Sequence, residues 1–432
     1  MIIPRPTGRP SWRNIAADRL LKVCGMDAEL GNFILGRKSS TSLGSGAEAS
    51  RLLLKEIPGV KTESRGLTQD SGGTSSWSGW VSPPAPSTTH GSPWLYGSGG
   101  DSSYTEPASS PSGGYGAGYG YGAYGFPSYN PQDWGRKFLA SNGGCFYIDL
   151  SHLEVCLPEV TSAFDHVACW HAMLLIARQA LEDANALLPR GETIKVLVNN
   201  SDGKGSSYGS HLNFLLTRQG WENIFHRKLH HMLFLASHLT SSIVYSGSGK
   251  VGSEDGAPPV DYQLSQRADF FRSLCAPQTT YDRPIVNSRD ESLADHETMA
   301  RLHVIFFDST LCHVASLLKV GVTQIIVAMI EQEFVDPRLI LDDPLEALLL
   351  WSHDVDLRAT ARLTTGEQYR AVDVQWAFHE LARRFVDEGG AEGVVPRAAE
   401  ILSIWEETLR RLDSDVDSLA SHVDWVLKRS IL

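Results

Sequence analysis

Two short segments place acidic and phenolic side chains at alternate positions, which is the pattern of residues on one face of a β-strand. Asp27 and Glu29 are separated by apolar residues, so their carboxylates point to the same side. Tyr147 and Asp149 alternate with apolar residues in the same way, and Glu154 follows shortly after. Carboxylates gathered on one sheet face repel each other unless a cation lies between them. Such hard oxygen ligands suit Mg²⁺, which in turn binds phosphate oxygens.

The same spacing also has an ordinary structural explanation. Alternating acids are common on half-exposed strands, where water solvates the carboxylates. The sequence does not show that the two segments are neighbours in the fold. On spacing alone, two solvated strands are therefore favoured over a metal site.

The elements that must position these side chains are strands in the middle of the chain and helices toward its end. Strands are predicted at residues 21–35, 145–152, 193–199, 284–288 and 302–307. Helices are predicted at residues 45–58, 161–188, 211–239 and 372–432, the first opened by a capping box at Ser45 and Glu48. Because strands and helices do not alternate, the pattern favours an α+β fold.

Residues 70–133 differ in composition from the rest of the chain. They are rich in Gly, Ser, Pro and Tyr and do not offer enough apolar surface to offset chain entropy, so we predict a disordered insertion. An inert loop is favoured there over tyrosine-driven self-association. The insertion separates residues 1–69, with the first acidic strand and helix, from residues 134–432, the main part with a helical C-terminal region.

Composition restricts the class of protein. The chain has 432 residues and a net charge of −12, which argues against non-specific binding of nucleic acid. Its six cysteines form no CxxC pair, which favours reduced thiols over disulfides or a zinc site. No apolar run is expected to reach the length of a membrane span, and no signal-type segment begins the chain. We therefore expect a cytoplasmic protein that binds neither membrane nor nucleic acid.

Seven longer blocks, in a constant order, resemble the Dop/PafA family, whose members remove or attach the small protein tag Pup. The blocks are NGGCFYIDLSHLE at 142–154, NNSDGKGSSYGSHLN at 199–213, SGSGKVG at 246–252, QLSQR at 263–267, RPIVNSRDE at 283–291, RLHVI at 301–305 and DWVLK at 424–428. An ordered series of this kind is far more specific than any single short motif.

The resemblance implies a fold like that of glutamine synthetase, in which a curved antiparallel sheet backed by helices cradles ATP and Mg²⁺. Carried over position by position, Asp27, Tyr147 and Glu154 fall on metal-ligand positions, and Glu29 matches the second acid of the first strand. Asp149 falls on the position of the catalytic aspartate. In the ligase branch that residue acts as a base toward the target lysine, and in the depupylase branch it attacks the amide or activates water.

Four further residues in these blocks are candidates for binding ATP or substrate. His211 and His303 are candidates to face the cleft, and a structural histidine is an equally good explanation for each. Arg267 and Arg289 are candidate phosphate partners, and the alternative is a salt bridge with a nearby aspartate, Asp269 or Asp290.

Several residues depart from the family pattern. Asp27 stands where the family has Glu, and Cys145 replaces an Arg expected to hold an ATP phosphate. Leu212 and Leu293 replace a Glu and a His. Each lost charged hydrogen bond costs about 1.5–3 kcal/mol, so we expect these changes to weaken ATP binding and, at Leu212, to reduce the charge around the cation.

Three functions remain open. The spacing of Asp149 and Glu154 is nearer to the Dop branch, which favours an amide or isopeptide hydrolase acting on Pup or a Pup-like tag with Mg²⁺ and ATP. The alternatives are an ATP-dependent carboxylate–amine ligase of the Pup type and a pseudoenzyme that acts as a binding or partner subunit. The expected partners are the tag and tagged proteins, and a homo- or hetero-oligomer is compatible with the sequence.

Overall fold

The computed structural model describes residues 20–37, 45–62, 135–290 and 295–432. The predicted insertion at 70–133 and Leu293 lie outside the described residues. The described residues form an α+β fold built around one large antiparallel sheet. This confirms the fold class expected from the sequence.

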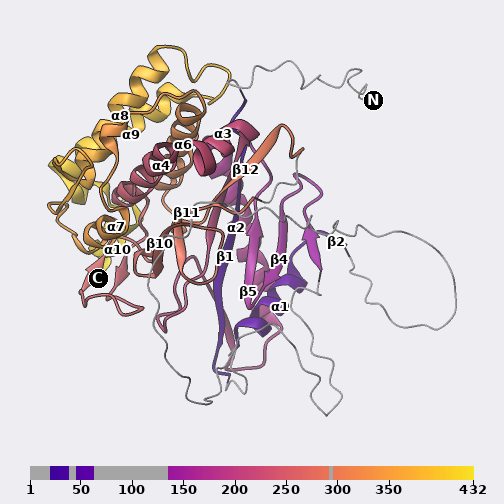
Figure 1. Ribbon diagram of the computed structural model, residues 1–432. Helices are drawn as coiled ribbons and strands as arrows, with labels where there is room; N and C mark the ends of the chain where they lie inside the picture. The colour runs from indigo at the N-terminus through magenta and orange to yellow at the C-terminus, as the bar shows by residue number, and fades with distance from the viewer. Residues whose placement is uncertain (1–19, 38–44, 63–134, 291–294) are drawn as a thin grey trace, which may run out of the picture. The chain divides into compact units, whose positions relative to one another are not determined.

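The main sheet has the strand order β12-β7-β1-β5-β4-β3-β2, with β6 pairing to the end of β1 (Figure 1). All of its pairings are antiparallel. The strands are β1 (Cys24–Leu35), β2 (Val60–Thr62), β3 (Arg136–Phe138), β4 (Cys145–Asp149), β5 (His152–Cys156), β6 (Thr193–Leu197), β7 (Ser210–Thr217) and β12 (Met299–Val304). β1 is the longest and pairs with three other strands, so it forms the centre of the sheet.

Helices and short strand pairs complete the described fold. The helices are α1 (Gly46–Glu56), α2 (Ala163–Ala186), α3 (Arg218–Glu222), α4 (Leu229–Ser241), α5 (Ile243–Ser246), α6 (His313–Glu331), α7 (Pro344–His353), α8 (Ala371–Asp387), α9 (Ala398–Ser414) and α10 (Asp424–Ile431). The remaining strands are β8 (Lys250–Val251), β9 (Tyr262–Gln263), β10 (Phe271–Ala276), β11 (Arg283–Asn287), β13 (Thr360–Arg362) and β14 (Gln368–Arg370).

The two faces of the main sheet have opposite character. On one face, Met26, Ala28 and Leu30 of β1 are fully buried and belong to the hydrophobic core. Helix α1 packs against β1, β4 and β5, and α6 packs against β7, so this face is covered by helices. The opposite face carries the alternate residues of the same strands, among them Asp27. Alternation along each strand therefore separates the core from the polar face.

Three local predictions are wrong. Residues 211–217 form strand β7 instead of the start of a helix, because they alternate polar and apolar and lie between β1 and β12. The predicted strand 145–152 is a hairpin that turns at Leu150, which has a φ of 51°. The Ser45 hydroxyl does not cap α1; it accepts a hydrogen bond from the Ile34 amide at 2.8 Å.

The expectation that no apolar segment reaches the length of a membrane span is also wrong. Helix α6 is long and apolar enough by length and composition alone. However, 89% of its most apolar window is buried inside the fold. It packs against α2, α9 and β7, so its apolar surface is used by the core.

A buried ion pair joins the end of α6 to the sheet. Lys22, just before β1, is paired with Glu331, and their side chains are only 1% and 3% exposed. Glu331 also accepts hydrogen bonds from the amide and hydroxyl of Thr217, at 2.7 and 2.8 Å, where β7 ends. Burial lowers the pKa of Lys22, and the charge and hydrogen bond of Glu331 oppose that shift. One carboxylate thus connects two strands of the sheet to the core helix.

Replacing Glu331 by alanine is expected to lower the free energy of unfolding by about 3–5 kcal/mol, because it leaves a buried ammonium without its partner. The measurement is chemical denaturation followed by circular dichroism. Glu182→Ala, which removes an exposed ion pair with Arg178 on α2, is the control and should leave the midpoint unchanged. Equal midpoints for the two variants would contradict a stabilising role for Glu331.

Candidate functional site

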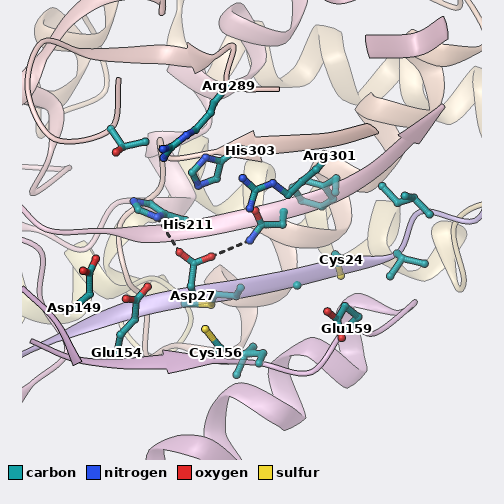
Figure 2. Close-up of a pocket in the computed structure, with 18 of the residues that line it drawn as sticks. Cys24, Asp27, Asp149, Glu154, Cys156, Glu159, His211, Arg289, Arg301 and His303 are labelled. Atoms are coloured by element: carbon teal, nitrogen blue, oxygen red, sulfur yellow. Dashed lines mark hydrogen bonds and ion pairs between the residues drawn. The ribbon is translucent and has the colours of Figure 1, made fainter. Parts of the chain in front are cut away.

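A cavity of about 720 Å³ lies on the polar face of the sheet, and side chains from β1, β4, β5, β7 and β12 line it. This volume is within the range of small-molecule and cofactor sites. Seven of the nine residues proposed from the sequence line it: Asp27, Tyr147, Asp149, Glu154, His211, Arg289 and His303. Figure 2 shows acidic side chains along one side of the cavity, and imidazole and guanidinium groups along the other.

Strand register explains why residues distant in sequence meet in the cavity. Asp27 on β1 lies opposite His211 on β7. Glu154 on β5 lies opposite Glu29 on β1 and opposite Tyr147 on β4. Directly opposite residues in an antiparallel pair point to the same face. The two acidic segments are therefore neighbours, which the sequence by itself did not show.

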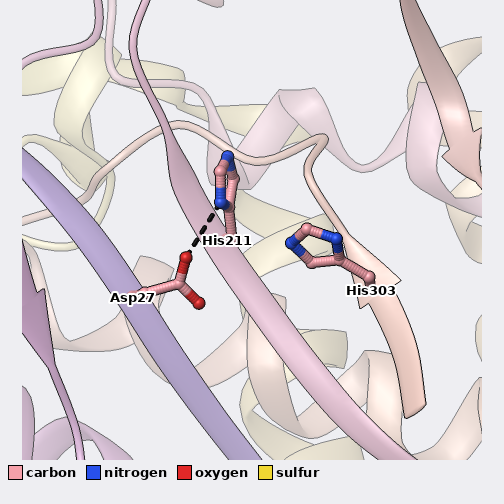
Figure 3. Close-up of side chains that lie close together, drawn as sticks. All are labelled: Asp27, His211 and His303. Carbon is pink, nitrogen blue, oxygen red and sulfur yellow. Dashed lines mark hydrogen bonds and ion pairs between the residues drawn. The ribbon is translucent and has the colours of Figure 1, made fainter. Parts of the chain in front are cut away.

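Asp27 lies at the centre of a histidine-containing cluster. Its carboxylate accepts hydrogen bonds from His211 Nδ1 and from Asn213 Nδ2, each at 2.9 Å. One possible ligand atom from each of Asp27, His211 and His303 lies within 4.8 Å of the others. Figure 3 shows these three side chains pointing toward one another from three adjacent strands. These ligand atoms are close enough together to hold one cation.

The protonation states of Asp27 and His303 suit metal binding. Burial alone would raise the pKa of Asp27, but the hydrogen bond and charge of His211, together with His303 and Asn213, hold it below its usual range. Burial and the nearby His211 lower the pKa of His303 to about 3, so its ring is neutral. A carboxylate and a neutral imidazole are the forms in which these side chains bind metals.

Glu154 is the most crowded acid in the cavity. Only 3% of it is exposed, and its Oε2 atom has no hydrogen-bond partner among the described residues. Burial, followed by the charges of Asp27 and other carboxylates, raises its pKa to about 9. Burial also raises the pKa of Tyr147, with a further contribution from the charge of Glu154. An unpartnered buried oxygen among several acids is stabilised by a proton or by a cation.

The hairpin between β4 and β5 positions Asp149. This residue is the last of β4 and pairs with His152 across a two-residue turn at Leu150 and Ser151. Its side chain is only partly exposed and lines the cavity on the same side as Glu154 (Figure 2). The predicted catalytic aspartate therefore lies at the acidic end of the cavity.

Two proposed residues are not part of the cavity lining. Glu29 is held by His152 Nδ1 at 2.9 Å and by the Gly209 amide at 3.1 Å. Arg267 is fully buried and donates to the Ser207 hydroxyl and to backbone carbonyls after β12. Asp269, the alternative partner of Arg267, accepts a hydrogen bond from Gln263, and Asp290 is paired with Arg218. Glu29 and Arg267 therefore organise the backbone around the site.

Other lining residues were missed by the sequence reasoning. Three guanidinium groups, those of Arg136, Arg289 and Arg301, line the same cavity as the carboxylates, and only Arg289 was proposed. The Arg136 guanidinium lies 3.7 Å from the centre of the Tyr147 ring. Asn213 and Arg301 were within the family blocks, so strand alternation around His211 and His303 could have identified them. No motif marked Arg136.

Two departures from the family pattern have different consequences in the structure. Cys145 lies on β4, two residues before Tyr147, so it shares the sheet face of Tyr147, but it is buried and is not among the residues that line the cavity. Leu212 is fully buried on the apolar face of β7, opposite Met26. The expectation that Leu212 reduces the charge around the cation is therefore wrong, because this position points away from the cavity. Leu293 lies outside the described residues.

The donor set fits divalent cations. Asp27, His211 and His303 could hold one cation, and Glu154 with Tyr147 supplies oxygen ligands beside it. Two imidazoles and one carboxylate suit a transition metal, whereas the oxygens of Glu154 and Tyr147 suit Mg²⁺ or Mn²⁺. The guanidinium groups in the same cavity suit an anionic oxygen compound such as a phosphate or carboxylate.

Comparison with known proteins shows that the chain is similar to proteins named as Pup ligases and depupylases. A family model described as Pup-ligase protein matches residues 101–432. A depupylase of Acidothermus cellulolyticus is 38% identical over 294 residues, covering 68% of this chain and 57% of that protein. A Pup–protein ligase of Pseudarthrobacter chlorophenolicus is 34% identical over 307 residues, covering 69% and 65%. The chain thus spans less than two thirds of the length of these curated relatives.

Solved structures agree with this relationship. The ligase PafA, in its complex with Pup, superposes with a TM-score of 0.66 at 20% identity, covering 96% of this chain and 69% of that chain. PafA in complex with ADP superposes with a TM-score of 0.58 at 25% identity, covering 70% and 65%. The likeness to the first structure concerns the fold, which agrees with the antiparallel sheet backed by helices expected for the Dop/PafA family.

Replacing Glu154 by glutamine is expected to weaken cation binding without changing the stability of the cation-free protein. Because Glu154 carries its proton when no cation is bound, the neutral amide is a close substitute and the melting temperature without cation should hardly change. A cation present at about 100 times its dissociation constant stabilises a protein by about 2.7 kcal/mol, and the variant should lose most of this gain. The measurement is thermal unfolding with and without Mg²⁺ or Mn²⁺.

The control for this experiment is Glu182→Gln, on the exposed surface of α2. It should keep the full cation-dependent shift. If Glu154→Gln shifted as much as the wild type on adding cation, Glu154 would not be a ligand.

Proposed function

This chain belongs to the Pup-ligase family, and from that premise we propose that it is a Dop-like hydrolase. Its reaction is removal of the amide from a C-terminal glutamine of Pup or a Pup-like tag, or cleavage of the isopeptide bond between such a tag and a lysine. The observation that carries this proposal is the shared cavity. Asp149, a cluster of possible cation ligands and three guanidinium groups all line this one cavity.

The relatives support an enzyme that acts on the bond between Pup and its target, without deciding between hydrolysis and ligation. Family members are named both as depupylases and as Pup ligases, and both activities make or break the same kind of amide bond. The depupylase of Acidothermus cellulolyticus has the higher identity of the two relatives described above, 38% against 34%. The Asp149–Glu154 spacing points the same way, so hydrolysis is the first choice.

We propose Mg²⁺ and ATP as cofactors. Asp27, His211, His303, Glu154 and Tyr147 would hold the cation, and Arg136, Arg289 and Arg301 would hold phosphate or the tag's carboxylate. A bound divalent cation supplies positive charge that polarises a carbonyl or phosphoryl oxygen. Each of these side chains is already on the cavity face, so binding needs no change in strand register.

Within this site, Asp149 acts as the nucleophile or the base. As a carboxylate at the end of β4, it can attack the amide carbon of the substrate or take a proton from an attacking water. The guanidinium groups orient the anionic end of the substrate by charge-assisted hydrogen bonds. Because the cavity is walled by a paired sheet, the carboxylate is held in one place during the reaction.

The proposed partners are Pup, or a tag of the same kind, and the proteins that carry it. The likeness of the fold to PafA, which was solved in complex with Pup, supports this choice. We also propose that the protein works in the cytoplasm. All six cysteines are free thiols, which suits a reducing compartment.

A Pup-type ligase is the main alternative. The relative from Pseudarthrobacter chlorophenolicus, at 34% identity, is named a ligase. In that reaction Asp149 would accept a proton from the attacking lysine. Incubation with Mg-ATP and each of three substrates separates the reactions: a tag ending in glutamine, a tag ending in glutamate with a lysine acceptor, and a preformed conjugate. Hydrolysis gives deamidated or released tag, and ligation gives new conjugate.

A pseudoenzyme is the second alternative, and Cys145 supports it because it replaces a family arginine. Leu212, which supported it from the sequence, no longer does so, since it lies in the core. Reduced protein that binds the tag but turns over none of the three substrates would favour the pseudoenzyme over both enzyme functions.

Asp149→Asn is expected to lower turnover of the accepted substrate by at least about a hundredfold, the usual minimum for a lost catalytic base. The melting temperature should stay within the error of the wild type, because Asp149 is only partly buried at a hairpin end. The measurement is product formation by mass spectrometry, with Asp183→Asn on the exposed face of α2 as control. Unchanged turnover in Asp149→Asn would remove this residue from the mechanism.

Arg136→Gln is expected to weaken ATP binding about tenfold or more, since losing a charged hydrogen bond costs about 1.5–3 kcal/mol. The measurement is calorimetric titration of ATP in the presence of Mg²⁺. Arg178→Gln, on an exposed position of α2, serves as the matched loss of one positive charge. If both variants bound ATP as tightly as the wild type, Arg136 would have no role in holding phosphate.

A further inference from the structure

Two cysteines lie directly opposite each other on neighbouring strands, and one of them, Cys156, lines the cavity. Cys145 on β4 is the register partner of Cys156 on β5. Opposite residues of an antiparallel pair share a face and have Cα atoms about 4.5–5.5 Å apart. A disulfide needs a Cα separation of about 4.4–6.8 Å. The strand positions of Cys145 and Cys156 therefore meet the backbone requirement for a disulfide.

This pair continues the row of cavity residues across the sheet. Cys156 is also the register partner of Asp27, which in turn faces His211, so one row runs from β7 through β1 and β5 to β4. Cys156 lines the cavity beside Asp27 (Figure 2). Cys145 is more deeply buried, at 4% exposure. A small oxidant that enters the cavity therefore meets Cys156 first, with Cys145 behind it.

We propose that Cys145 and Cys156 form a reversible disulfide when a peroxide enters the cavity, and that this bond lowers the affinity of the cavity for its cation. The sulfur of Cys156 attacks hydrogen peroxide, whose O–O bond breaks to give a sulfenic acid and one water. The sulfur of Cys145 then displaces the hydroxyl group, which leaves as a second water. Two thiols lose two electrons and two protons, and a dithiol reductant reverses the change.

Strand pairing, and not thiol acidity, selects these two residues. Burial raises the pKa of both thiols, so their first reaction with peroxide is slow. The neighbouring thiol then captures the sulfenic acid before further oxidation. The other strand cysteines have no such neighbour among the described residues: Cys24 lies opposite Phe214, and Cys275 opposite Val286.

The disulfide would act on the cation through the groups that the thiols contact. Burial raises the pKa of both thiols, and Tyr147 near Cys156 and Arg136 near Cys145 oppose that rise, which places these two side chains close to the sulfurs. Both contacts change when the sulfurs bond to each other. Loss of an outer contact of a metal ligand typically weakens metal binding 10- to 100-fold. This consequence rests on the proposed cation site, whereas formation of the disulfide does not.

The first experiment detects the bond itself. The full chain is treated with hydrogen peroxide, remaining thiols are alkylated, and intact mass and peptide maps are recorded before and after treatment with a dithiol reductant. We expect the loss of two hydrogen atoms, a peptide linkage between Cys145 and Cys156, and full reversal. Cys145→Ser and Cys156→Ser should abolish the linkage, and the partly exposed Cys169→Ser and Cys275→Ser should keep it.

The second experiment measures cation affinity in the reduced and the oxidised protein, with Mn²⁺ as the probe. We expect a 10- to 100-fold loss on oxidation, regained on reduction and absent in Cys156→Ser. Two free thiols after peroxide, a linkage to another cysteine, or irreversible oxidation of Cys156 alone would overturn the proposal. A mapped disulfide with unchanged Mn²⁺ affinity would overturn its effect on the cation. If the reduced protein bound no cation, the proposed function would fail while the mapped disulfide stood.

Discussion

The pairing of β1 with its neighbours is the constraint on which the site depends. β1 is hydrogen-bonded to β5 on one side and to β7 on the other, so Asp27 lies in one row with Cys156 and His211. A shift of either pairing by one residue would turn every side chain of that strand to the opposite face. The alternation that buries Met26, Ala28 and Leu30 therefore also fixes the direction of Asp27. Core packing and cavity chemistry are consequences of the same register.

This constraint concentrates charge in a place that is unfavourable without a ligand. Glu154 is nearly buried beside other carboxylates, and it lies opposite Glu29 on the neighbouring strand. Like charges directly opposite in a sheet are destabilising. The chain partly relieves this crowding by pairing Glu29 with His152 and Asp27 with His211. The Oε2 atom of Glu154 keeps no hydrogen-bond partner among the described residues, and it is the group that the proposed cation would contact.

Many of the residues that made the family recognisable serve architecture. The QLSQR block at 263–267 is buried, and the carboxylate of Asp308 accepts hydrogen bonds from Ser265 and from the Gln266 amide. Arg267 in the same block holds the backbone after β12, the strand that carries His303. These contacts hold the loops around the sheet in one arrangement. A block shared across a family thus marks what positions a site as often as what reacts in it.

The sequence by itself determined the fold class, the acidic positions and the family, because side-chain alternation and ordered motifs are local properties. Asp27, Tyr147, Asp149 and Glu154 were identified in this way, and the structure brings all four into one cavity. Residues 211–217 were read as helix because a leucine-rich run fits either element, and only two partner strands decide between them. Leu212 was misjudged for the same reason, since its direction depends on register. Tertiary structure alone revealed Arg136 beside Tyr147 and Cys145 opposite Cys156, because contacts between strands leave no spacing signal along the chain.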